Sequence, residues 1–135
     1  MIFRNEYWFM SNMFECPFTY NGLTFRNVEA AFHAQKSTTH EKQFCDLDGF
    51  TAKKLGRRVP LRADWSAVRV SIMTEIVRQK FRQNPALQVL LLNTGDQPLV
   101  EENTWNDTFW GTCNNRGENH LGKILMIVRS ELRRT

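Results

Sequence analysis

The Asn21-Gly22 pair is the feature that most limits how this 135-residue chain can fold. Asn-Gly supplies the two positive φ angles of a type I′ turn, which joins antiparallel strands through a two-residue loop. Apolar residues alternate with polar ones on both sides of the pair, as in a half-buried hairpin: Phe18, Tyr20, Leu23 and Phe25. The pattern predicts a β-hairpin over residues 17–25.

A short amphipathic helix is predicted directly after the hairpin, over residues 27–36. Asn27 stands at the N-cap position, and the helix dipole favours a carboxylate in the first turn, where Glu29 lies. Residues at i, i+3, i+4 and i+7 share one helical face, and here they are Glu29, Phe32, His33 and Lys36. A carboxylate and an ammonium on one face can flank a small molecule. The alternative is an amphipathic helix with solvated charged ends.

Five more helices are predicted from apolar residues at i+3 and i+4 spacing. They are expected over residues 40–47, 51–58, 65–83, 86–92 and 121–132. The expected capping residues are Thr39, Asp64, Asn84 and Asn119, with Asp48-Gly49 ending the first of these helices and Pro60 stopping the second. An extended segment is expected at 9–12 and a short strand at 99–102. These elements predict one domain over residues 1–135, of α+β class and mainly helical, with a small antiparallel sheet.

Composition narrows the class of protein. A chain of this length buries a core without disulfides or metal. Its three cysteines are odd in number and have no CxxC spacing, as is typical of reduced thiols in a cytosolic protein: Cys16, Cys45 and Cys113. Residues 1–10 contain no apolar run of signal or membrane length, so we expect a cytoplasmic protein without a membrane partner.

Charge points to an anionic ligand. The net charge of +4 permits a phosphate-bearing ligand but is small for a dedicated nucleic-acid surface. Arg57 and Arg62 lie beside a predicted turn, where they are candidates for phosphate binding. Solvated helix faces are the alternative.

Three carboxylates near aromatic residues are candidates for acid–base chemistry: Glu29, Glu101 and Asp107. Asp107 lies between Trp105 and Trp110, and burial beside an indole would raise its pKa and make it a proton donor. An Asx-turn that caps the long polar loop over 103–119 is the alternative. For Glu101 the alternative is a solvent-facing strand residue. The three histidines show no paired-ligand spacing, so we expect neither a metal nor a cofactor.

A series of motifs resembles, in its order, the NADAR superfamily, also called YbiA-like. The resemblance runs from about Phe9 to Arg129 and is specific because so many separate motifs occur together. The motifs are FMSN, PFTYNGLTF, NVEAAFHAQK, LGRR, LRADW, KF at Lys80-Phe81, LLNTGDQPLVEEN, DTFWG and NHLGKILMIVR.

The resemblance implies a YbiA-like fold and an N-glycosidase that cuts the bond between ribose C1′ and a nitrogen. The implied substrate is a ribosylamino-pyrimidine phosphate of riboflavin synthesis, or ADP-ribose attached to guanine in nucleic acid. A catalytically silent module that binds ADP-ribose or a nucleotide is the alternative. No obligate protein partner is expected.

The resemblance also suggests roles for individual residues. Glu29 would transfer protons at the sugar and the leaving nitrogen, and Lys36 would be a nucleophile or an electrostatic partner. Asp107 is the third catalytic candidate. Arg57 or Arg62 would hold phosphate, and Trp65 or Trp110 would stack on the base. The expected substrate-binding residues are Asn12, Phe32, Arg57, Arg62, Trp65, Glu101, Trp110, Gly111 and Asn119.

Overall fold

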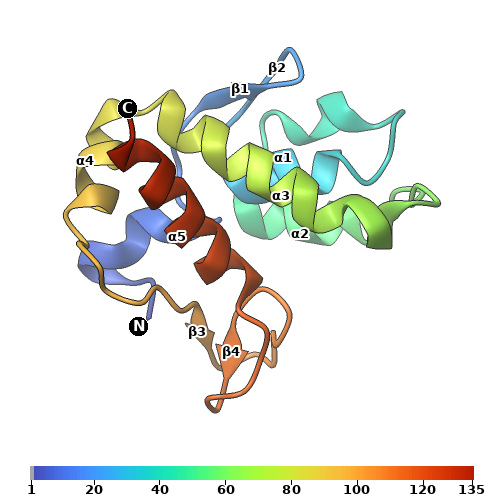
Figure 1. Cartoon of the computed structure of the whole chain (residues 1–135). Helices are drawn as coiled ribbons and strands as arrows, with labels where there is room; N and C mark the ends of the chain where they lie inside the picture. The colour runs from blue at the N-terminus through green and yellow to red at the C-terminus, as the bar shows by residue number, and fades with distance from the viewer. Residues whose placement is uncertain (1) are drawn as a thin grey trace. The chain divides into compact units, whose positions relative to one another are not determined.

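The computed structural model describes residues 2–135, which form five α-helices, two 3₁₀ helices and four short strands (Figure 1). The described residues divide into two compact units. Unit 1 contains residues 2–11 and 85–135, and unit 2 contains residues 12–84. The predicted α+β, mainly helical class is confirmed. Within residues 2–135, no helix has both the length and the apolar character needed to cross a membrane.

Unit 2 begins with the predicted hairpin. β1 (Phe18–Tyr20) pairs antiparallel with β2 (Leu23–Phe25). Asn21 and Gly22 have φ angles of 51° and 78°, so the turn has the positive φ values that favour this dipeptide. Phe18 of β1 and Phe25 of β2 are paired across the hairpin, and both side chains are buried in the core.

Helix α1 (Val28–Ala34) starts where predicted but ends two residues early. The Asn27 side chain accepts a hydrogen bond from the Ala30 N–H at 2.7 Å, which confirms the predicted N-cap. Its amide also donates to Glu15 at 2.8 Å and to the Leu47 carbonyl at 3.0 Å. Asn27 therefore fixes the start of α1 against two other segments of unit 2.

Two predictions about the next helices are wrong. In place of a helix over 40–47, unit 2 has the 3₁₀ helix η2 (Glu41–Phe44). The Thr39 hydroxyl does not cap this helix but is hydrogen-bonded to the His40 ring. Asp48 does not end that helix but starts α2 (Gly49–Gly56), because its carboxylate accepts from the Thr51 N–H at 2.8 Å. An Asp-Gly pair can end one helix or cap the start of the next. Here the hydrogen bond from the Thr51 N–H shows that Asp48 caps the start of α2.

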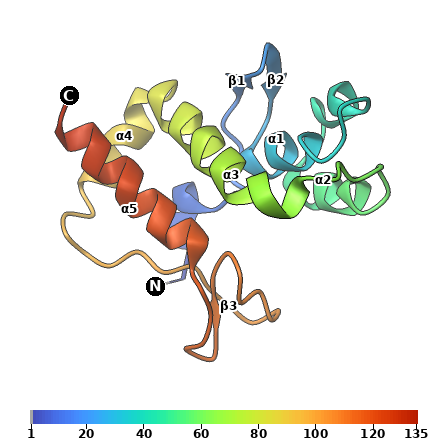
Figure 2. The ribbon, with the colours of Figure 1, turned by 45° about the vertical axis from the view of Figure 1, so that its right-hand side comes forward.

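Helix α3 (Trp65–Arg82) is the longest of the described elements and carries the predicted apolar face. Its buried apolar residues are Trp65, Met73, Ile76, Val77 and Phe81. Asp64 occupies the N-cap position, yet its carboxylate bonds Arg62 rather than a helix amide. Within unit 2, α1 packs against both α2 and α3, so α1 is the central helix of this unit (Figure 2).

Unit 1 is built on α4 (Pro85–Leu92) and α5 (His120–Arg133), which pack against each other. Its N-terminal segment forms the 3₁₀ helix η1 (Asn5–Met10), so the extended segment predicted at 9–12 is wrong for Phe9 and Met10, whereas the backbone of Ser11 is extended. The strand predicted at 99–102 is replaced by β3 (Glu102–Asn103), which pairs in parallel with β4 (Thr112–Cys113). This second, parallel pair was not predicted because each of its strands has only two residues, too few to show an alternating pattern.

Lys80 of α3 is buried in unit 2 with its ammonium nitrogen near two aromatic rings. The Nζ atom lies 5.6 Å from the ring centroid of Phe14 and 5.3 Å from that of Phe81. Burial lowers the pKa of Lys80 from 10.5 to about 8. The folded protein therefore binds this proton less tightly than the unfolded chain does.

We predict that Lys80 makes stability rise with pH. Between about pH 8 and 10.5 the unfolded chain carries the Lys80 proton and the folded chain loses it, so the free energy of unfolding increases. The slope is at most ~1.4 kcal/mol per pH unit. Urea unfolding of the wild type and of Lys80→Met from pH 7.5 to 10 measures this as a difference in which the titrations of groups that do not interact with Lys80 cancel. A difference that does not change with pH contradicts the prediction.

Candidate active site

The face of α1 carries Glu29 and His33 one turn apart. His33 Nε2 lies 2.8 Å from Glu29 Oε1, and the two side chains are only 8% and 14% exposed. The Glu29 N–H donates to the Asn12 carbonyl at 3.0 Å, so Glu29 is held by its backbone as well as by its carboxylate. The Glu29 carboxylate is therefore held in a fixed position and is largely shielded from water.

Lys36 follows α1 in a turn rather than lying in the helix itself. Its carbonyl accepts from the Arg62 N–H at 2.8 Å, and its Nζ atom lies 5.9 Å from the ring centroid of Trp65. Trp65 in turn packs on Phe32, with ring centroids 5.0 Å apart. The amine therefore lies beside an aromatic wall formed by Phe32 and Trp65.

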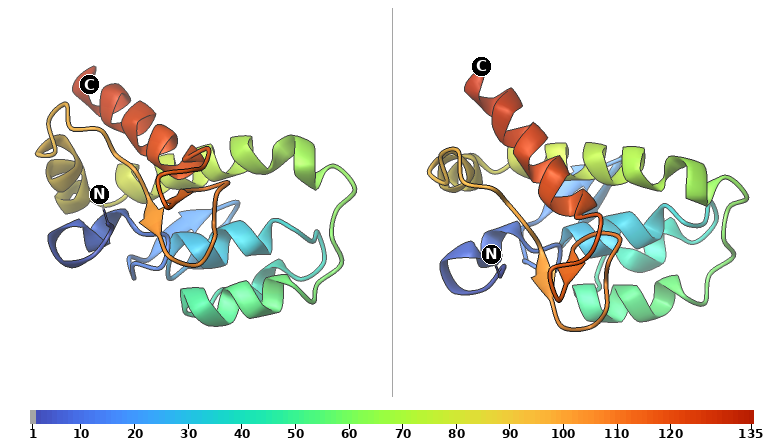
Figure 3. Two further views of the ribbon diagram at one scale, coloured as in Figure 1. Left: turned by 90° about the horizontal axis from the view of Figure 1, so that it is seen from below. Right: turned by 60° about the horizontal axis from the view of Figure 1, so that its bottom comes forward.

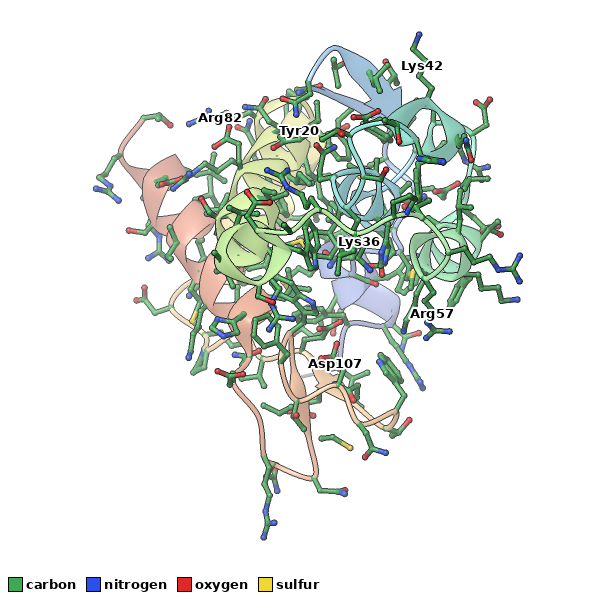
Figure 4. The ribbon with its side chains drawn as sticks, turned by 90° about the vertical axis from the view of Figure 1, so that its right-hand side faces the viewer. Tyr20, Lys36, Lys42, Arg57, Arg82 and Asp107 are labelled. Carbon is green, nitrogen blue, oxygen red and sulfur yellow. The ribbon has the colours of Figure 1, made fainter. Side chains whose placement is uncertain are left out.

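Several groups act on the Lys36 ammonium. Burial lowers the pKa of Lys36, the negative charge of Glu29 opposes this, and the positive charges of Arg57 and Lys53 lower the pKa further. Figure 4 labels Lys36, which follows the end of α1, and Arg57, which follows the end of α2. Lys36 is therefore a neutral amine more often than a solvated lysine is.

Helix α2 lies directly against this face through glycine at both of its ends (Figure 3). A Cβ atom on Gly49 would lie 3.3 Å from the Cβ of Glu29 and would overlap the Met13 sulfur. A Cβ atom on Gly56 would overlap the His33 ring at Nδ1. The two glycines allow a close approach of α2 that a side chain would prevent.

The two predicted phosphate-binding arginines differ in their surroundings. Arg57 is exposed immediately after α2. The Arg62 guanidinium is bonded to Asp64, through Nε at 2.6 Å and Nη2 at 3.1 Å. An anion at Arg62 would have to compete with this carboxylate, whereas Arg57 is open to solvent.

The predicted substrate-binding residue Asn12 is buried, and its side-chain amide lies 3.8 Å from the Met73 sulfur.

In unit 1, Asp107 forms the Asx-turn that the sequence allowed as its alternative role. Its Oδ1 accepts from the Phe109 N–H at 3.1 Å and from the Trp110 N–H at 2.9 Å. The Asn103 side chain holds the Asp107 backbone on the other side, through bonds of 2.8 and 3.1 Å. Asp107 therefore shapes the loop that carries Trp110.

Asn119, Glu101 and Gly111 lie together in unit 1. Asn119 has a φ of 53°, and its side chain does not cap α5 as predicted. It accepts instead from the Glu101 N–H at 3.0 Å and donates to the Leu99 carbonyl at 3.0 Å. The Gly111 carbonyl accepts from the Asn119 N–H, and a Cβ on Gly111 would overlap the Glu101 carbonyl. Asn119 thus links the segment at residues 99–101 to Gly111 through hydrogen bonds.

The predicted site residues fall into one group in each unit. Unit 2 brings together Asn12, Glu29, Phe32, Lys36, Arg57, Arg62 and Trp65. Unit 1 holds Glu101, Asp107, Trp110, Gly111 and Asn119. Sequence reasoning assigned no role to His33, although its i, i+4 spacing from Glu29 is the signal for their contact.

A family model described as the NADAR domain matches residues 2–133. The chain belongs to the NADAR family. The resemblance of the sequence motifs to this family is therefore confirmed.

Other members of this family resemble the chain along most of its length. N-glycosidase YbiA of Escherichia coli K12 is 34% identical over 134 residues, which cover 95% of this chain and 83% of YbiA. The NMR structure of Escherichia coli YbiA superposes with a TM-score of 0.85 at 32% identity, covering 96% of this chain and 80% of that one. Riboflavin biosynthesis protein VVA0006 of Vibrio vulnificus is 39% identical over 130 residues. These residues are 92% of this chain but only 35% of that protein.

The Asx-turn of this NADAR protein leads to a stability prediction. Asp107→Ala removes the acceptor of two backbone N–H groups and should lower the free energy of unfolding by about 1 kcal/mol. Asp107→Asn keeps an oxygen at the same position and should stay near wild type. Urea unfolding of the three proteins measures both differences. Equal stability of Asp107→Ala and wild type would rule out this role for the carboxylate.

Proposed function

We propose that this protein is an N-glycosidase that hydrolyses the bond between ribose C1′ and a nitrogen atom. The observation that carries the proposal is the placement of a shielded carboxylate, Glu29, within electrostatic reach of a half-buried amine, Lys36. The names of relatives within the NADAR family, N-glycosidase YbiA among them, agree with it.

The reaction needs a proton carrier and a nucleophile. The aminoribose ring opens when the ring oxygen takes a proton from solvent and its bond to C1′ breaks, which leaves an iminium between C1′ and the leaving nitrogen. The neutral Lys36 amine adds to C1′, and the later hydrolysis of the Schiff base returns the proton to solvent. Glu29 takes a proton from the Lys36 nitrogen and gives it to the leaving nitrogen, whose bond to C1′ then breaks. Water hydrolyses the resulting Lys36 Schiff base, which releases the sugar and restores the amine. The lowered pKa of Lys36 supports this role, because only the neutral amine can add.

The proposed substrate carries phosphate next to the ribose. A ribosylamino-pyrimidine phosphate of riboflavin synthesis and ADP-ribose on guanine both satisfy this, and the exposed Arg57 suits an anionic group. The name of the Vibrio relative favours the riboflavin intermediate. The free cysteines at 16, 45 and 113 are consistent with the reducing cytoplasm as the place of action.

Incubation with each substrate tests the function directly. Mass spectrometry should detect released ribose phosphate from the pyrimidine compound, or released ADP-ribose from ADP-ribosyl-guanosine. Turnover of neither substrate, together with measurable ADP-ribose binding, would support a binding module instead. Asp107→Asn, which keeps the loop acceptor, separates a catalytic role of Asp107 from its structural one.

We predict that Glu29→Gln and Lys36→Ala each lower kcat at least about 100-fold while the protein stays folded, because each removes a group that moves protons or bonds to C1′. Circular dichroism checks the fold. Borohydride added during turnover should trap a sugar adduct on the wild type and none on Lys36→Arg. Wild-type rates in both Glu29→Gln and Lys36→Ala would refute the assigned roles.

We also predict that Arg57→Ala raises KM by about tenfold and changes kcat little, because it removes a charge that binds phosphate in ground and transition states alike. Arg58→Ala, a change at the exposed neighbouring residue, is the matched control and should behave as wild type. Steady-state kinetics on the phosphorylated substrate measure both constants. An unchanged KM in Arg57→Ala excludes the phosphate role.

A further inference from the structure

The His33 ring has two nitrogens in different environments. Nε2 lies 2.8 Å from Glu29 Oε1. Nδ1 is buried from solvent and has no hydrogen-bond partner among residues 2–135. The difference between the two nitrogens determines which protonation state of the ring fits the structure.

Only one state leaves no buried donor without an acceptor. A doubly protonated ring, or a neutral ring with its proton on Nδ1, would bury an N–H group that has no hydrogen-bond acceptor among residues 2–135. The second of these would also turn the Nε2 lone pair toward the Glu29 carboxylate. A neutral ring with its proton on Nε2 avoids both costs, because Nε2–H donates to Glu29 and only a lone pair is buried at Nδ1. This hydrogen bond fixes the orientation of the Glu29 carboxylate.

The neighbours of His33 fix the ring in this orientation. Gly56 closes the Nδ1 side, where a Cβ atom would overlap the ring. Phe32 lies edge-on to it, with centroids 5.5 Å apart and planes at 70°. The ring is thus confined between an aromatic residue, a glycine and the carboxylate that it binds, with little room to turn.

We propose that His33 is a positioning residue for this reaction: its Nε2–H holds the Glu29 carboxylate in a fixed orientation, and Gly56 makes room for the ring that does so. The proposal rests on the proposed function, since it assumes that Glu29 moves protons during turnover. It requires Glu29 to begin the cycle as a base, taking the proton from the Lys36 nitrogen before giving it to the leaving nitrogen.

Two substitutions of His33 separate hydrogen bonding from packing. His33→Leu fills the space without a donor and should lower kcat about 10- to 100-fold with little change in KM, the size expected for a hydrogen bond to a charged group. His33→Gln restores an N–H donor and should recover most of kcat. His40→Leu changes a half-exposed histidine elsewhere in unit 2 and serves as the control. A wild-type kcat in His33→Leu, or a His33→Gln variant as slow as His33→Leu, overturns the proposal.

Gly56 provides an independent test. Gly56→Ala leaves every functional group in place but pushes on the ring, so it should lower kcat in the wild-type background. In a His33→Ala background the ring is gone and only a contact of 3.1 Å with the Cβ of residue 33 remains, so adding Gly56→Ala should cost much less. Equal losses from Gly56→Ala in both backgrounds would show that the methyl group acts other than through His33.

Two controls keep this inference apart from the proposed function. If the wild type turns over neither substrate, the proposed function fails before any His33 variant is compared. The protonation state is then still measurable, because a long-range proton–nitrogen-15 NMR spectrum of the resting protein distinguishes the ring forms. We expect Nε2 protonated and Nδ1 unprotonated. A His33 ring protonated at Nδ1 overturns the proposal regardless of activity.

Discussion

The side chain of Asn27 is the constraint on which unit 2 depends. It is fully buried and makes three hydrogen bonds, to the Ala30 N–H at the start of α1, to Glu15, and to the Leu47 carbonyl. Because these bonds fix where α1 starts, they also fix the residues at set offsets along it. Glu29 follows two positions later, and its N–H donates a hydrogen bond to the Asn12 carbonyl. The placement of the proposed proton carrier is thus a consequence of a helix cap.

A helix of seven residues is too short to be stable alone, so its neighbours must hold it in place. Helix α2 does so through Gly49 and Gly56, which bring its backbone against the Glu29 and His33 side chains. This close approach removes water from the face that carries the chemistry. It therefore stabilises α1 and shields its carboxylate with the same contact, so that fold and proposed function place the same demand on these two glycines.

Local chemistry explains what the sequence could predict. The Asn21-Gly22 hairpin, the Asn27 cap and the contact of Glu29 with His33 one turn later follow from turn types and helical periodicity. Contacts between distant segments explain what it could not. Asn119 bonds to the segment near Glu101 instead of capping α5, and the surroundings of His33 Nδ1 are set by Gly56 on another helix. Spacing pairs His33 with Glu29, but only tertiary packing decides which ring nitrogen is left without a partner.

The proposed chemistry requires two groups with opposed preferences to lie close together. An ionised Glu29 attracts a proton to Lys36 and raises its pKa, whereas the proposed attack on C1′ needs the neutral amine. Burial of Lys36 and the nearby charges of Arg57 and Lys53 act in the opposite direction. The hydrogen bond from His33 would add to this, because a carboxylate oxygen that accepts an N–H group has less negative charge available to hold the ammonium. On this reasoning His33 orients Glu29 and weakens its hold on the Lys36 proton, so that a base on α1 and a free amine in the turn after α1 can coexist.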